Sequence, residues 1–316
     1  MLSFIVNRAL QMIPVIFGVT VVTFALTQII PGDLVDVMLG STASEDARQE
    51  LRHALGLDQP VIVQYFSYMS HLLSGDLGRS HLFSLPVASV LGDRLVNTAI
   101  LAVSATVVAT ALGIAIGTWV ALKPGSLRDR GFTVAVLFLN SMPPFWFGLL
   151  LILFFGLSLG LLPVSGMYAV VDGGGLGDLL AHMVMPTLTL AAWSLAIIAR
   201  MTRSALLDVI NSDYIRTARS RGLAEPRIIA NHALPNAMPQ VITVIGLQAG
   251  FLLSGAVLTE TVFSWPGIGL AMYQAISARD IPFIQGGVLL LAIVFVLINF
   301  VVDALYAYVN PKIKLA

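Results

Sequence analysis

Long runs of apolar residues without charge divide the 316-residue chain. A charged side chain at the centre of a bilayer costs about 2.5–3.5 kcal/mol, and a helix needs roughly 20 apolar residues to cross the hydrocarbon. Six runs meet this requirement, over residues 9–32, 95–122, 131–171, 179–199, 228–259 and 281–302. The pattern predicts an all-α membrane protein with six transmembrane helices.

The third run is too long for one span. Pro163, Gly166 and the glycines at 173–175 favour a loop outside the membrane, after a helix over about 132–161. Within that helix, Ser141-Met142-Pro143-Pro144 predicts a kink. The kink either frees carbonyl groups toward a cavity or serves packing alone.

Two pairs of glycines stand four residues apart inside predicted spans. They are Gly113 with Gly117 and Gly246 with Gly250. Such pairs permit close helix packing, although the spacing is common in membrane helices.

Composition narrows the class of protein. Apolar residues make up 57% and charged residues 11%, against about 45–50% and 25% in soluble domains, so an ordinary soluble enzyme is excluded. With 17 basic and 17 acidic residues, the chain shows no basic excess for nucleic acid. It lacks Cys, a G-x-S-x-G nucleophile pattern and a G-x-x-x-x-G-K-[ST] phosphate loop, and its five histidines make no paired metal spacing. We therefore predict no catalytic residue and no metal site.

Basic residues are distributed unevenly over the loops between the predicted spans. Because cytoplasmic loops carry the excess of Lys and Arg, the distribution places both termini in the cytoplasm. Five of the 17 basic residues fall outside: Arg48, Arg52, Arg79, Arg94 and Arg279. The other twelve fall inside: Arg8, Lys123, Arg128, Arg130, Arg200, Arg203, Arg216, Arg219, Arg221, Arg227, Lys312 and Lys314.

The outer segment between the first two spans, residues 33–94, carries a helix pattern of its own. Thr42-Ala43-Ser44-Glu45 has the form of a capping box, and Gly56 is a stop signal. Between them, apolar residues recur at helical spacing: Ala47, Leu51 and Leu55. We predict an N-terminal part with the first span (1–32), a small helical extracytoplasmic segment (33–94) and a core with the remaining five spans (95–316), which includes an inner loop over 200–239.

The inner loop over about 200–239 holds six of the twelve inner basic residues. Asn211-Ser212-Asp213 offers helix caps for a short helix over 214–221, which Gly222 ends. A second short helix begins at Pro226 and runs until Pro235. Two interpretations remain open on physical grounds: an amphipathic loop whose arginines face lipid headgroups, or a docking surface for a protein.

The same loop resembles the EAA loop of bacterial ABC importer permeases. That motif reads EAA, three residues, Gly, nine residues, Ile, one residue, Leu-Pro. Gly222 and Leu234-Pro235 match with the full spacing, while the motif's Glu falls on Arg216, its first Ala on Thr217 and its Ile on His232. These departures are similar to those of the dipeptide, oligopeptide and nickel branch of the family.

Further segments resemble that branch over nearly the whole chain. They are Pro31-Gly32-Asp33, Gly56-Leu57-Asp58-Gln59-Pro60 with Gln64-Tyr65, Gly75-Asp76-Leu77-Gly78 with Ser80, the stretch from Glu260 to Gly269, and Arg279-Asp280-Ile281-Pro282. No single tetrapeptide is specific, but the ordered set is similar to the first permease of a dipeptide or oligopeptide importer.

The resemblance implies a permease subunit in the bacterial inner membrane that forms half of a pathway for peptides or similar small solutes. Its partners would be a homologous second permease, two ATPase subunits that bind ATP and Mg, an extracytoplasmic solute-binding protein and membrane lipid. The chain itself would hold no cofactor. The coupling loop would dock on the ATPase through Tyr214, Arg216, Thr217, Ala218, Arg219, Gly222, Leu234 and Pro235.

Acidic residues near span ends leave an alternative open. Glu260 and Asp303 lie at the ends of the fifth and sixth spans, where an acid either reaches headgroups or water, or has a function. For Glu260 the family-like segment implies a role at an outer gate with Pro266 and Gly267. The alternative function is a stand-alone proton-coupled transporter, with Glu260 or Asp303 as the carrier.

Overall fold

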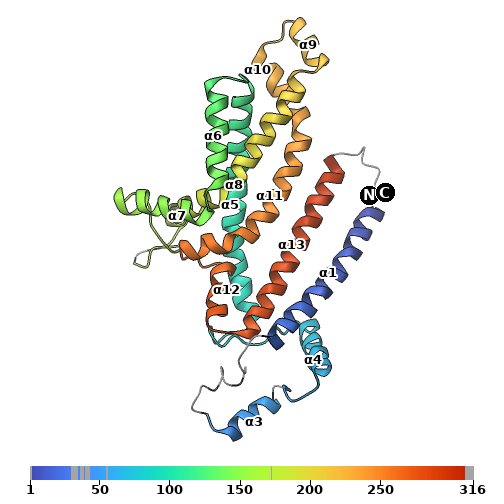
Figure 1. Ribbon diagram of the computed structural model, residues 1–316, viewed down its shortest axis with the longest axis vertical. Coiled ribbons are helices and arrows are strands. Elements are labelled where there is room, and N and C mark those ends of the chain that lie inside the picture. Colours follow the sequence, from blue (N-terminus) through green and yellow to red (C-terminus); the bar gives the residue numbers. More distant parts are fainter. Residues whose placement is uncertain are drawn as a thin grey trace. The chain divides into compact units, whose positions relative to one another are not determined.

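The computed structural model describes residues 2–29, 35, 39, 43–54, 56–171 and 173–309 (Figure 1). These residues form helices joined by turns and loops, with no β-strand among them beyond an isolated bridge between Arg79 and Pro86. The all-α prediction is therefore confirmed for the described chain.

Five long helices account for five of the six predicted runs. They are α1 (Leu2–Ile29), α5 (Val87–Ala121), α8 (Leu176–Ile210), α11 (Leu234–Val262) and α13 (Ile281–Val309). Within the described residues, α5, α8 and Ile281–Val302 are long and apolar enough to cross a membrane, and the number rises to five if each sharply bent helix pair counts as one span. In α1, the apolar stretch Leu10–Ala25 is shorter. The count of six spans stays a prediction.

The third run does not form a single kinked helix over 132–161, so that prediction is wrong. Instead, α6 (Leu127–Ser141) is followed by α7 (Pro144–Leu151) and the π-helical η1 (Ile152–Ser158), at an angle of 103°. The break falls at the predicted place. Met142 and Pro143 have extended backbone (ψ 130° and 131°), because a residue before proline is disfavoured in the helical region.

The chain folds into two compact units, of which the first consists mainly of Asn97–Pro266. In this unit α8 packs against α6, α7 and α11. The predicted boundaries at 32/33 and 94/95 stay predictions. Buried apolar side chains fill the contacts, and the largest include Leu101, Ile198, Leu206, Leu252 and Trp265.

Gly113 and Gly117 let α5 approach α8 closely. A Cβ on Gly113 would lie 2.8 Å from Ile198 Cγ2. A Cβ on Gly117 would collide with the Ala199 carbonyl oxygen and lie 2.7 Å from Thr202 Cβ. The close packing that this pair permits is confirmed, because these positions tolerate no side chain without movement of the backbone.

The second unit consists of Leu2–Val96 and Gly267–Val296 and contains α3 (Glu45–Ala54), α4 (Val61–Leu73) and α12 (Ile268–Ser277). The predicted helix before Gly56 is confirmed by α3, although Thr42, Leu55 and the Pro31-Gly32-Asp33 segment lie outside the described residues. Gly56 has the left-handed φ of +66° that a helix stop requires. The Ser44 hydroxyl accepts from the Ala47 N–H (3.3 Å), as a helix cap does.

A buried aspartate connects the loop around Ser80 and Leu82 to the start of α13. Asp280 accepts hydrogen bonds from the Ser80 hydroxyl, the Leu82 N–H and the Phe283 N–H. Side chains of α5, α12 and α13 pack beside this point, among them Val87, Leu91, Ile268 and Phe283. Residues that resemble the family's outer segment are thus brought together, although Ser80 and Asp280 are 200 positions apart.

Candidate functional site

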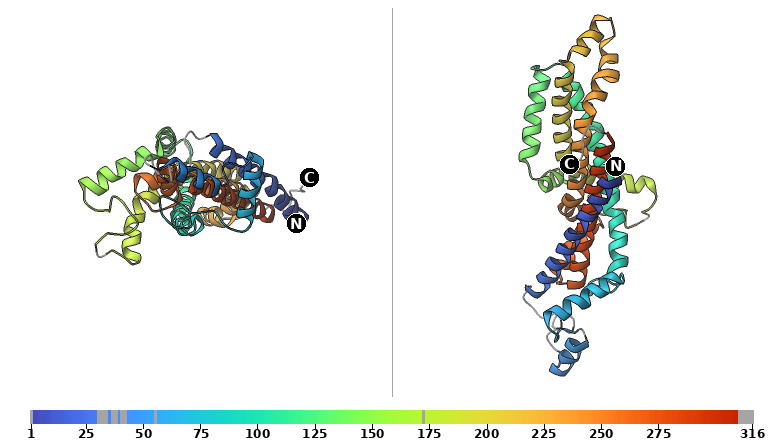
Figure 2. Two further views of the ribbon diagram at one scale, coloured as in Figure 1. Left: turned by 90° about the horizontal axis from the view of Figure 1, so that it is seen from below. Right: turned by 90° about the vertical axis from the view of Figure 1, so that its right-hand side faces the viewer.

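The inner loop forms the predicted short helix followed by a glycine turn. Helix α9 (Asp213–Ser220) begins after Ser212, whose backbone is extended. Gly222 has φ +76°, and its N–H donates to the Arg219 carbonyl (2.9 Å). Since L-residues are strained in this conformation, glycine is the residue that can end the helix here. Figures 1 and 2 show α9 at the end of the bundle of α6, α8 and α11.

The second helix does not stop at Pro235, so that prediction is wrong. Helix α10 (Glu225–Ile228) passes through the π-helical η2 (Ile229–Ala233) directly into α11, with Pro235 in its first turn. The wider π turn changes the hydrogen-bond register just before Pro235, which has no N–H to donate. The Asn236 side chain donates to the His232 carbonyl (2.6 Å). The part of the inner loop after the Gly222 turn is therefore the beginning of the helix that continues into α11.

Helix α9 has a buried face and an exposed face. Ile215 is fully buried, and Ala218 and Leu223 pack against the same apolar cluster. Tyr214 is 46% exposed. The exposed residues of the helix and its C-terminal cap are Asp213, Tyr214, Arg216, Thr217, Arg219, Ser220 and Arg221. One side of the helix thus fastens it to the bundle, and the other remains available to a partner.

The two arginines expected on one docking face have different surroundings. Arg216 Nη1 lies 3.4 Å from Asp213 Oδ1, at the long end of an ion pair. Arg219 forms a two-pronged contact with Glu225, at 2.7 and 3.2 Å. Hydrogen bonding from Arg219 holds the pKa of the Glu225 carboxyl below its usual value and raises the pKa of Arg219. Both partners are therefore charged at neutral pH.

The other predicted docking residues differ in exposure. Gly222 and Pro235 are exposed, and Ala218 and Leu234 are half-buried. Sequence reasoning missed Glu225 and the anchor Ile215; the opposite charges on either side of Gly222 were the available signal for Glu225. Three loop arginines have no ion pair within the described residues: Arg200, Arg221 and Arg227.

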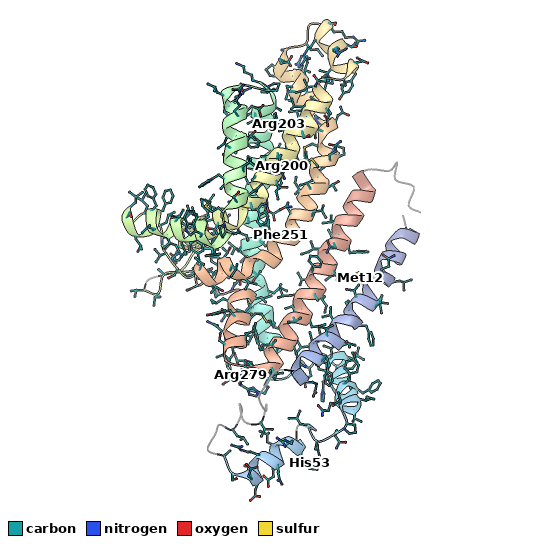
Figure 3. All side chains as sticks on the ribbon, viewed as in Figure 1. Met12, His53, Arg200, Arg203, Phe251 and Arg279 are labelled. Atoms are coloured by element: carbon teal, nitrogen blue, oxygen red, sulfur yellow. The ribbon has the colours of Figure 1, made fainter. Side chains whose placement is uncertain are left out.

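A second ion pair joins the start of α6 to α8. Arg203, labelled in Figure 3, donates through Nε and Nη2 to the two Asp129 carboxylate oxygens at 2.7 and 2.9 Å. The Gly125 N–H also donates to Asp129 (2.8 Å), whose side chain is 8% exposed. This pair, which the sequence did not reveal, ties α6 to the helix that leads into α9.

Glu260 does not reach water, so its interpretation as an exposed interfacial residue is wrong. Its side chain is fully buried in α11 and accepts a hydrogen bond from the Thr98 hydroxyl of α5 (2.7 Å). The neighbouring Asn97 side chain donates to the Pro266 carbonyl (2.8 Å), and Trp265 Nε1 donates to the Asn97 carbonyl (3.0 Å). Tertiary packing thus takes the acid out of solvent.

Two candidates remain: Gly267 of the predicted outer gate, and Asp303 at the end of the sixth span. Gly267 stands immediately before α12 with extended backbone. The side chain of Asp303 lies outside the described part of α13, so the structure gives no geometry for a carrier role at this position.

Comparison with known proteins identifies the family. The model of the binding-protein-dependent transport system inner membrane component matches residues 113–315, and the model of the N-terminal part of such components matches residues 1–106. The chain is 45% identical to the di/tripeptide transport system permease protein DppB of Pseudomonas aeruginosa (strain UCBPP-PA14), over 99% of each chain. It is 39% identical to the glutathione transport system permease protein GsiC of Salmonella choleraesuis (strain SC-B67), again over 99% of each.

Among solved structures, the chain resembles the methionine ABC transporter MetNI in an inward-facing conformation. The TM-score is 0.54 and the identity 20%, over 70% of this chain and 96% of the other, so this likeness shows the fold alone. The full-length relatives and the two family models favour an ATP-dependent system over a stand-alone carrier. The chain belongs to the family of inner membrane components of binding-protein-dependent transport systems, and it is a permease subunit of the ABC transporter class.

Proposed function

We propose that this permease imports short peptides and is driven through α9 by ATPase subunits. The relatives are named for the transport of di- and tripeptides, dipeptides and glutathione, all of which are short peptides. Each relative is matched over 99% of its length, so the whole permease is shared. The names of these full-length matches support a short peptide as the substrate.

The observation that carries the coupling role is the two-faced anchoring of α9. Ile215 fixes the helix to the bundle, while the side chains of Tyr214, Thr217 and Arg221 are exposed to solvent. An ATPase subunit seated on this face would move α8 and α11 together, because α9 follows α8 and precedes the helix that continues into α11. ATP and Mg would be bound and hydrolysed by that partner, with no catalytic residue in this chain.

The assembly that we propose contains a homologous second permease, two ATPase subunits and an extracytoplasmic binding protein. The six charge-free runs support six spans, and the unequal distribution of Lys and Arg supports a cytoplasmic location for both termini. The binding protein would meet the outer segment around α3. Near the outer ends of α5 and α11, buried Glu260 and the Asn97–Pro266 contact would position the outer gate.

Gly222→Trp tests the coupling role. A bulky L-residue at φ +76° is strained by about 1–2 kcal/mol, which displaces the turn between α9 and α10. We expect peptide uptake per ATP hydrolysed, measured in proteoliposomes containing all subunits, to fall roughly fivefold or more. The variant should still insert into the membrane.

Gly160→Trp is the matched control. Gly160 also has a left-handed φ (+61°), open space around its Cβ position and an exposed place after η1, outside the turn between α9 and α10. We expect coupling in this variant to stay near that of the unmodified chain. Normal uptake per ATP in Gly222→Trp, or an equal loss in both variants, would argue against a specific role for the α9 turn.

A further inference from the structure

The corner between α9 and α10 is bridged by a pair of opposite charges. Arg219, in the last turn of α9, makes its two-pronged contact with Glu225, the first residue of α10. Between them the chain turns at Gly222, whose backbone adopts a left-handed conformation. A glycine turn is the most deformable part of the loop, and the ion pair spans it.

Stability of the fold does not explain this contact. The side chains of Arg219 and Glu225 are 40% and 51% exposed, and exposed ion pairs contribute little to folding. The forked guanidinium nevertheless fixes direction as well as distance, because two parallel hydrogen bonds hold the two groups in one plane. The pair restricts the orientation of α9 more than it stabilises the chain.

The orientation of α9 matters because Glu225 begins a long helical segment. Helix α10 passes through η2 into α11 without a break, so the carboxylate is attached to the end of a long helix. With the pair formed, a displacement of α9 must move that helix. Without it, rotation at Gly222 can absorb the displacement.

We propose that Arg219 is a positioning residue. Its contact with Glu225 holds α9 at a fixed angle to α11, so that a movement of the docked ATPase subunit is transmitted to the membrane-spanning helices. This proposal rests on the docking of an ATPase subunit at α9. It assigns Arg219 to the internal geometry of the loop. In this proposal, the solvent-exposed residues Tyr214, Thr217 and Arg221 make the contact with the ATPase.

A charge exchange tests the proposal. Arg219→Glu and Glu225→Arg each place like charges across the turn, whereas the double variant restores opposite charges. We expect each single variant to lower peptide uptake per ATP hydrolysed roughly 2–5-fold in proteoliposomes with all subunits, and the double variant to recover most of the loss. Retention of the ATPase on purification should stay near normal in all three. Lys123→Glu, an exposed charge reversal between α5 and α6, controls for net charge.

Two results would overturn the proposal. If the double variant is no better than Arg219→Glu and loses the ATPase, Arg219 contacts the partner directly. If neither single variant changes uptake per ATP, the pair does not transmit movement. Arg221→Glu tests the docking of the ATPase separately. If ATPase retention and coupling are both normal in Arg221→Glu and in Gly222→Trp, the partner does not bind at α9.

Discussion

Gly117→Ala is expected to destabilise the permease by about 2–3 kcal/mol, an effect much larger than its single methyl group suggests. The new Cβ would collide with the Ala199 carbonyl oxygen and crowd Thr202, and a backbone oxygen cannot rotate away as a side chain can. Helices α5 and α8 must therefore separate, which removes packing that holds membrane helices together. The effect is measured as a shift in the midpoint of thermal unfolding in detergent, which size-exclusion chromatography monitors.

Gly92→Ala provides the comparison within the same helix. A Cβ at Gly92 meets no atom within 4 Å, so the substitution adds only helix propensity, worth roughly 0.5–1 kcal/mol in favour of folding. We expect the two alanine variants to move the unfolding midpoint in opposite directions. Equal midpoints would show that α5 and α8 do not pack at the distance described.

Arg203→Ala is the second large effect, with an expected loss of about 3 kcal/mol in the free energy of unfolding. Removal of the guanidinium leaves the Asp129 carboxylate buried, with the Gly125 N–H as its remaining donor within the described residues, and an unpaired buried charge is costly. The start of α6 would then separate from α8. The same thermal assay measures the loss, and limited proteolysis of the turn between α5 and α6 reports its location.

Arg200→Ala is the matched control for this substitution. Arg200 lies one turn earlier on α8, is exposed and has no ion pair among the described residues (Figure 3). We expect a change within about 0.5 kcal/mol. A loss as large as that of Arg203→Ala would contradict the importance of the Asp129 contact. Asp129→Asn removes the charge of this side chain but keeps its shape. We expect its loss in the free energy of unfolding to lie between those of Arg200→Ala and Arg203→Ala.

The features that sequence predicted well are those set by local rules. Charge-free runs predicted the long helices, because hydrocarbon excludes charge whatever the tertiary arrangement is. Gly222 and Gly56 marked helix ends, since a left-handed residue at that point favours glycine strongly. Pro143 and Pro144 located the break between α6 and α7 for a similar reason, the loss of a donor and the steric clash with the preceding residue.

The features that sequence did not predict depend on distant partners. The 103° angle between α6 and α7 is set by packing on α8, and no local signal encodes it. Asp129 and Arg203 are 74 positions apart, and Thr98 and Glu260 are 162 apart, so their spacing gives no warning of contact. Pro235 shows the converse error, because a local stop signal was overridden by a π turn.

Crosslinking from the exposed face of α9 tests the central claim, that this helix docks on an ATPase subunit. The chain has no Cys, so Thr217→Cys provides a unique thiol for a photoactivatable reagent. Ile215→Cys, buried on the opposite face of the same helix, serves as the control. We predict that Thr217→Cys crosslinks to an ATPase subunit in the assembled transporter and that Ile215→Cys does not. Crosslinks to lipid alone from Thr217→Cys would contradict the account and favour a loop that rests on the membrane surface.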